Sequence, residues 1–161
     1  MRRFKQQLDM EDAVEILNSC TNGILSLADA DGEPYGVPLS YVYDGCGHLY
    51  MHSAAAGRKN DCIEADSRCS FCVVSQDKIV AEKFTTYFRS VIVAGKIKIL
   101  ADKEEMIKGL VMLCDKYCPG IDPTKEIDRF VNMVKVLRVD IESITGKESI
   151  ELVRQRRQTD I

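Results

Sequence analysis

The chain of 161 residues is 45% hydrophobic and 29% charged, a composition typical of one globular domain with its own core. A net charge of -3 gives no reason to expect nucleic acid as the main partner, and no apolar run approaches the roughly 18 residues that a membrane-spanning helix needs. The basic N-terminus continues into Gln6, Gln7 and Asp9, with no apolar segment after it, so we expect a cytoplasmic protein without a secretory signal.

The N-terminal third is predicted to form a helix and then a meander of three strands. Asp9 can cap a helix over residues 10–19, and period-two patterns mark strands over 24–28, 34–43 and 48–53. The middle strand carries five large side chains on one face, namely Tyr35, Val37, Leu39, Tyr41 and Tyr43. Pro38 cannot donate to a sheet ladder, so one side of this strand must lack a full partner.

The rest of the chain alternates helices with strands. Residues 54–66 read as a loop and a short helix, and strands follow over 69–75 and 86–100, the second with a bulge or bend at Gly95. The connection between these two strands is polar and contains Lys78. Two further helices are expected, one from Asp102 through Tyr117 and one over 126–135, before a last strand over 136–142.

This order of elements predicts an α+β fold for residues 1–150, a six-stranded antiparallel split β-barrel with flanking helices. Residues 151–161 are expected to be a polar tail in which Arg154, Arg156 and Arg157 are solvated.

Seven cysteines, an odd number, are expected to be free thiols in a reducing compartment. Cys69 and Cys72 form a CxxC pair, but they lie in a predicted strand, where residues three apart point to opposite faces. A structural zinc ion needs thiolates that converge on it, so no metal site is predicted.

The segment from Tyr50 to Asn60 has the pattern of a phosphate site. A strand ends, small residues follow, and Gly57, Arg58 and Lys59 open a helix. The free N–H groups and the positive end of a helix attract anions, and Ser53 with the two basic residues adds donors and charge. The same pattern is common at structural helix starts, so the spacing alone leaves both interpretations open.

Several segments, in their order and spacing, resemble the nitroimidazole-resistance (Nim) subgroup of the pyridoxamine-phosphate-oxidase-like split barrels. The resemblance covers about residues 2–150 and is carried by Gly23–Ala28, Gly36–Asp44, Leu49–Ala54, Gly57–Lys59, Phe88–Lys96 and Ile144–Ser149.

The resemblance implies a homodimer that binds two FMN molecules at the subunit interface. By position, the strand along the isoalloxazine edge would be Val37, Pro38, Leu39, Ser40 and Tyr41. The next strand would end beside the cofactor with His52, Ser53 and Ala54, and the phosphate would be held by Gly57, Arg58 and Lys59. Phe88, Arg89 and Ser90 would approach FMN from the partner subunit, and Lys147 would close the site.

The implied function is an FMN-dependent oxidoreductase that reduces a small electron-poor substrate, with nitroimidazoles as the family's suggestion. The flavin itself transfers the hydride, so the protein has to bind it, orient it and supply protons. His52 is the candidate proton donor, and the alternative is a histidine hydrogen-bonded inside the barrel mouth. The tyrosine stripe favours core and interface packing over stacking on the flavin.

Two other functions stay open. One is a flavin-binding or redox-sensing protein without turnover. The other is a split barrel that uses deazaflavin F420 or haem, for which His52 and Cys72 are the candidate haem ligands.

Overall fold

The structure is a computed structural model that describes residues 4–159. These residues form seven strands, five α-helices and two short 3-10 helices. The strands are β1 Asn22–Ala28, β2 Pro34–Ser40, β3 Val42–Tyr43, β4 His48–Ala54, β5 Arg68–Val80, β6 Thr85–Ile99 and β7 Val134–Glu148. The α-helices are α1 Met10–Ser19, α2 Arg58–Ala65, α3 Lys103–Tyr117, α4 Thr124–Phe130 and α5 Ile150–Thr159, and the 3-10 helices are Phe4–Gln6 and Ala81–Lys83.

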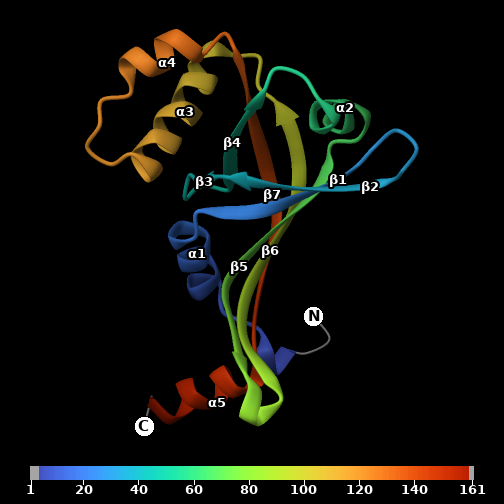
Figure 1. Cartoon of the computed structure of the whole chain (residues 1–161), viewed down its shortest axis with the longest axis vertical. Coiled ribbons are helices and arrows are strands. Elements are labelled where there is room, and N and C mark those ends of the chain that lie inside the picture. The colour runs from blue at the N-terminus through green and yellow to red at the C-terminus, as the bar shows by residue number, and fades with distance from the viewer. Residues whose placement is uncertain (1–3, 160–161) are drawn as a thin grey trace.

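All seven strands belong to one antiparallel sheet in the order β2-β1-β5-β6-β7-β4-β3. The two edge strands, β2 and β3, are consecutive in the sequence and are separated only by Tyr41. The two edges of the sheet are therefore brought together by one short segment, and the sheet curls on itself (Figure 1). The predicted α+β class is confirmed, and the expected partnerless side of the Pro38 strand is the free edge of β2.

The expected count of six strands is wrong by one, because the predicted strand over 34–43 divides at Tyr41. The Tyr41 N–H donates to the Tyr117 hydroxyl (2.9 Å) and not to a neighbouring strand. Its own hydroxyl donates to the Leu17 carbonyl (2.8 Å), and its ring lies edge-on to Phe71 with centroids 4.8 Å apart. These contacts turn the chain inward between β2 and β3.

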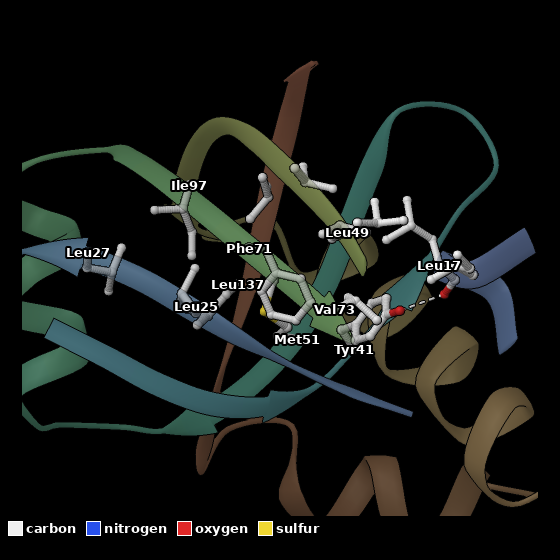
Figure 2. Close-up of a cluster of buried hydrophobic side chains, with 14 of the residues drawn as sticks. Leu17, Leu25, Leu27, Tyr41, Leu49, Met51, Phe71, Val73, Ile97 and Leu137 are labelled. Atoms are coloured by element: carbon white, nitrogen blue, oxygen red, sulfur yellow. Dashed lines mark hydrogen bonds between the residues drawn. The ribbon is translucent and has the colours of Figure 1, made fainter. Parts of the chain in front are cut away.

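The core lies inside the curled sheet. Figure 2 shows Phe71, Leu25, Leu137 and Met51 from four strands, with Tyr41 hydrogen-bonded to Leu17 of α1 at one side. A second, smaller cluster lies on the outer face of β4 and β7 under α3, formed by Val42, Tyr50, Leu100, Leu113 and Val136. Successive β4 residues therefore alternate between two hydrophobic layers, because side chains alternate along a strand.

In two more places the bounds of the elements differ from those expected, and in a third an expected feature is confirmed. β5 extends to Val80, so Lys78 lies within a strand and β5 with β6 forms a long hairpin arm (Figure 1). The helix expected over 126–135 ends at Phe130, and Val134 already belongs to β7. The bulge at Gly95 is confirmed, since the β6–β7 register shifts there and an added Cβ would collide with the Asp140 carbonyl.

Residues 150–159 form helix α5 and not the expected polar tail. Leu152 and Val153 are buried, and the Arg156 guanidinium pairs with Asp12 of α1 and Glu148 of β7. Arg154 is exposed as expected, whereas the side chain of Arg157 lies outside the described part of the structure.

Candidate functional site

The loop after β4 and the start of α2 form a segment that we call the cradle (residues 54–59). Gly57 precedes the helix with φ 133° and ψ 166°, a backbone conformation that residues with a Cβ rarely adopt, and it offers no side-chain cap. Within the described part of the chain, Ala55 and Ala56 make no hydrogen bond. The first N–H groups of a helix also lack intrahelical partners, so the cradle presents several free donors.

Lys59 adds an uncompensated positive charge to the cradle. Its side chain is half-buried, and its ammonium group has no hydrogen-bond or ion-pair partner among residues 4–159. Burial lowers the pKa of this ammonium group, because removing a charge from water disfavours the charged form. A bound anion would provide the partner that the protein itself does not.

Arg58, the other basic residue predicted to hold a phosphate, is paired elsewhere. Its Nη2 lies 3.1 Å from Asp29 Oδ2, and its guanidinium lies 4.9 Å from the centroid of the Tyr35 ring. The Glu33 backbone N–H and the Arg58 guanidinium together hold the pKa of the Asp29 carboxyl below its usual value. Arg58 therefore points toward the turn between β1 and β2.

Two polar side chains fix the start of the cradle. Ser53 Oγ and Asn60 Nδ2 both donate to the Ala54 carbonyl at 3.1 Å, and both residues are buried. The sequence pattern singled out Ser53 but not Asn60. The only signal for Asn60 was a polar residue within the first turn of a short helix, which is too common to be informative.

His52 lies on the outer face of β4, opposite Val136 of β7. Its side chain is exposed and has no hydrogen-bond partner in the described residues. The interpretation of His52 as a hydrogen-bonded residue inside the barrel mouth is therefore wrong. The imidazole is free to approach a molecule bound outside the barrel.

The residues expected along the isoalloxazine edge divide between the two faces of β2. Val37 and Leu39 pack against the core, while Pro38 and Ser40 are exposed on the outside. Tyr41 is fully buried, and its N–H and hydroxyl are both engaged, so it serves the core.

An exposed row of apolar side chains, the outer row, crosses the sheet from Pro38. In register, Pro38 pairs with Ile24, Ile24 with Cys72, and Cys72 with Ile92. Ile24 and Ile92 are 42% and 46% exposed, so the outer row offers an exposed apolar surface across four strands.

Phe88, Ser90 and Lys147 form a separate cluster, the distal group, on β6 and β7. Ser90 pairs with Lys147, whose ammonium lies 5.1 Å from the Phe88 ring centroid. Arg89 points to the other face, where its Nε lies 3.1 Å from Oε2 of the fully buried Glu148. Arg89 therefore does not join the distal group.

One chain does not bring the cradle and the distal group together. His52 pairs with Val136, and Lys147 is eleven residues further along β7 (136 to 147). At about 3.3 Å per residue, they are separated by roughly 35 Å of strand. In Figure 1, α2 and the β5–β6 arm lie toward opposite ends of the molecule.

The thiols and acidic residues show no converging ligands. Within residues 4–159, no group of three or more His, Cys, Asp or Glu side chains could hold a metal ion, and all seven cysteines are free. Burial raises the pKa of the Cys69 thiol to about 12. Cys72 lies on β5 and His52 on β4, with β6 and β7 between them, so they do not form one haem site.

None of the helices in the described residues has the length and apolar character to span a membrane.

Known proteins share the fold described above. A family model described as pyridoxamine 5'-phosphate oxidase matches residues 9–148. The chain is similar to the structure of a candidate 5-nitroimidazole antibiotic resistance protein of Bacteroides thetaiotaomicron, with 24% identity and a TM-score of 0.75 over 88% of this chain and 86% of the other.

Two further solved structures carry the names of cofactors. A FAD-binding protein of Mesorhizobium loti is 26% identical, with a TM-score of 0.67 over 89% of this chain and 97% of the other. A FAD- and haem-binding protein of Mycobacterium smegmatis is 19% identical, with a TM-score of 0.74 over 90% and 73%. No curated protein matches the chain. Because the family match spans residues 9–148 and the fold is shared over most of the chain, the protein belongs to the pyridoxamine 5'-phosphate oxidase family of flavin-binding split barrels.

Proposed function

We propose that the protein is an FMN-dependent oxidoreductase that reduces a small electron-poor substrate. The observation that carries the proposal is the half-buried Lys59 ammonium, which has no partner in the described residues and belongs to the same segment as the free N–H groups of Ala55 and Ala56. A phosphate monoester supplies the charge and acceptors that this arrangement lacks. The cradle fits the phosphate of FMN.

The cradle has one uncompensated cation, and this favours FMN, which carries one phosphate, over FAD, which carries a pyrophosphate. Arg58 is neutralised by Asp29, which leaves Lys59 as the cradle's one unpaired basic side chain in the described structure. One ammonium and one helix terminus match a single phosphate better than a pyrophosphate. The relatives that bind FAD or haem keep those cofactors as alternatives to be separated by experiment.

The complete site requires a second copy of the chain. A flavin whose phosphate is held at the cradle starts roughly 35 Å along the strand from the distal group of the same protomer, so it does not contact both. A homodimer in which each copy lends Phe88, Ser90 and Lys147 to the other brings both halves to one ligand. The exposed apolar outer row is suited to be covered by such a contact.

When bound, the flavin supplies hydride transfer, and the chain's own residues hold and orient it. Lys59 and the cradle N–H groups bind the phosphate end. His52, exposed and without a partner, delivers a proton from its ring nitrogen to the reduced substrate. The similarity to a candidate nitroimidazole resistance protein makes nitroaromatic compounds the first substrates to assay.

Titration with FMN and riboflavin tests the phosphate assignment. Lys59→Ala removes one charge-assisted contact, which costs about 1.5–3 kcal/mol, or about ten- to a hundredfold in FMN affinity. Riboflavin has no phosphate, so it should bind weakly to both proteins and be nearly indifferent to the substitution. Arg58→Ala is the matched control, and it should change FMN affinity far less because Asp29 already neutralises Arg58. Equal FMN affinities for wild type and Lys59→Ala would place the phosphate elsewhere.

A further inference from the structure

Asn60 ties together the two ends of the loop that forms the cradle. Its Nδ2 donates to the carbonyl of Ala54, where the loop begins, at 3.1 Å. Its main-chain N–H donates to the carbonyl of Gly57, where the loop ends, at 2.8 Å. One residue therefore sets how far residues 54–57 curve before α2 starts.

This arrangement leaves a polar atom of Asn60 without a partner. The residue is 5% exposed, and its Oδ1 is buried with no hydrogen bond in the described structure. Its neighbours in α2, Cys62 and Ile63, are buried and apolar. A buried acceptor without a donor is unfavourable, so a leucine of similar shape would suit the folded chain at least as well.

Helix capping does not explain why an asparagine occupies this position. Gly57 is the cap residue, which makes Asn60 the third residue of the helix. A capping side chain at that position accepts a hydrogen bond from the cap N–H, whereas Asn60 donates, and it donates to a carbonyl three residues before the cap. The contact shapes the loop and leaves the helix end uncapped.

We propose that Asn60 is a positioning residue for the phosphate: it holds residues 54–57 in the curve that points the N–H groups of Ala55 and Ala56 toward the same place as the Lys59 ammonium. This inference rests on the proposed binding of FMN at the cradle. Asn60 acts through Ala54 and does not touch the ligand, since its free oxygen is buried. Its unsatisfied oxygen is a cost in stability that is retained for binding, as is common at functional sites.

The test compares Asn60→Leu with wild type in stability and in ligand preference. Leucine keeps the branched shape but removes the donor to Ala54 and the buried acceptor. We expect an unchanged or higher melting temperature, at least a tenfold loss of FMN affinity, and less than a twofold change for riboflavin. In the ligand-free protein, the 15N order parameters of Ala55, Ala56 and Gly57 should fall from rigid values near 0.85 toward about 0.6.

Cys62→Ala is the control, because Cys62 is fully buried in the same helix but makes no hydrogen bond to Ala54. It should lower the melting temperature and leave the ratio of FMN to riboflavin affinity unchanged. If Asn60→Leu keeps the wild-type ratio, or loses stability and both ligands together, Asn60 is a structural residue and the inference is wrong. If wild type itself binds FMN no better than riboflavin, the proposed phosphate site fails first, and the order parameters alone then report whether Asn60 shapes the loop.

Discussion

At the scale of single residues, the proposed chemistry depends on His52. Its exposed, unpartnered imidazole lies on the same face of β4 as Tyr50, two residues before the cradle begins at Ala54. His52→Ala should leave FMN bound within a few-fold and slow the reoxidation of reduced flavin by a nitroaromatic acceptor by roughly 10²–10⁴, the usual cost of losing a positioned proton donor. Rapid mixing of chemically reduced protein with the acceptor measures this. Equal rates would make His52 non-catalytic, and loss of FMN would make it a binding residue.

Lys59 predicts how FMN affinity depends on pH. Burial places the pKa of its ammonium below the ordinary 10.5 in the free protein, and a bound phosphate dianion should raise it again. The phosphate itself is fully charged well above its second pKa of about 6. FMN affinity should therefore stay level from neutral pH and fall as the pH rises through the lowered pKa of Lys59, with proton uptake on binding. In Lys59→Arg the side chain stays charged, so FMN affinity should no longer fall at high pH. If FMN affinity falls with pH equally in wild type and Lys59→Arg, Lys59 does not bind the phosphate.

Residue types and spacing located the cradle but not the partners of its charges. Gly57, Arg58 and Lys59 stand together in the sequence, yet only Lys59 is left without a partner. Arg58 is neutralised by Asp29, 29 residues earlier, and Arg89 by Glu148, 59 residues later. Such long-range ion pairs leave no periodic signal, so a single sequence cannot distinguish a ligand-binding arginine from a structural one.

At the scale of elements, α5 is held by a chain of charges around one buried carboxylate. Glu148 is fully buried, with Oε2 3.1 Å from Arg89 Nε and Oε1 2.9 Å from Arg156 Nη2. Glu148→Ala should lower the free energy of unfolding by about 1.5–3 kcal/mol, the value of hydrogen bonds to charged groups. The loss should be no larger, because both arginines are partly exposed and water can solvate them once the carboxylate is gone. Glu142→Ala, which removes an exposed partner of Lys96 from the same strand, should change it by less than about 0.5 kcal/mol. Urea unfolding measures both, and equal losses would show that the buried charges do not hold α5.

Helices and strands were predicted correctly where the hydrophobic period was regular. The prediction failed where a distant contact overrode that period. The stripe of Ala13, Ile16 and Leu17 fixed α1, and the glycine in β6 marked its bulge. The period of two runs unbroken through Tyr41, so nothing local marks the break that Tyr117 imposes from 76 residues away. The charged composition of residues 150–159 concealed a helix, because only Leu152 and Val153 carry its buried face.

At the scale of the whole molecule, two observations support the proposed second copy. The distal group and the cradle are too far apart in one chain to share a flavin, and the outer row is exposed in the monomer. The order of elements was sufficient to predict the fold class from sequence. The distance between the cradle and the distal group was visible only once the strand registers were known.

The most direct test is sedimentation velocity of the protein mixed with FMN, followed at both protein and flavin absorption. Because two 18.1 kDa chains are proposed to share each site, the flavin signal should sediment with a dimer, at one FMN per chain, and denaturation should release it as FMN. Flavin that remains at the free-ligand boundary, or that travels with an 18.1 kDa monomer at micromolar concentration, would contradict an interfacial FMN site.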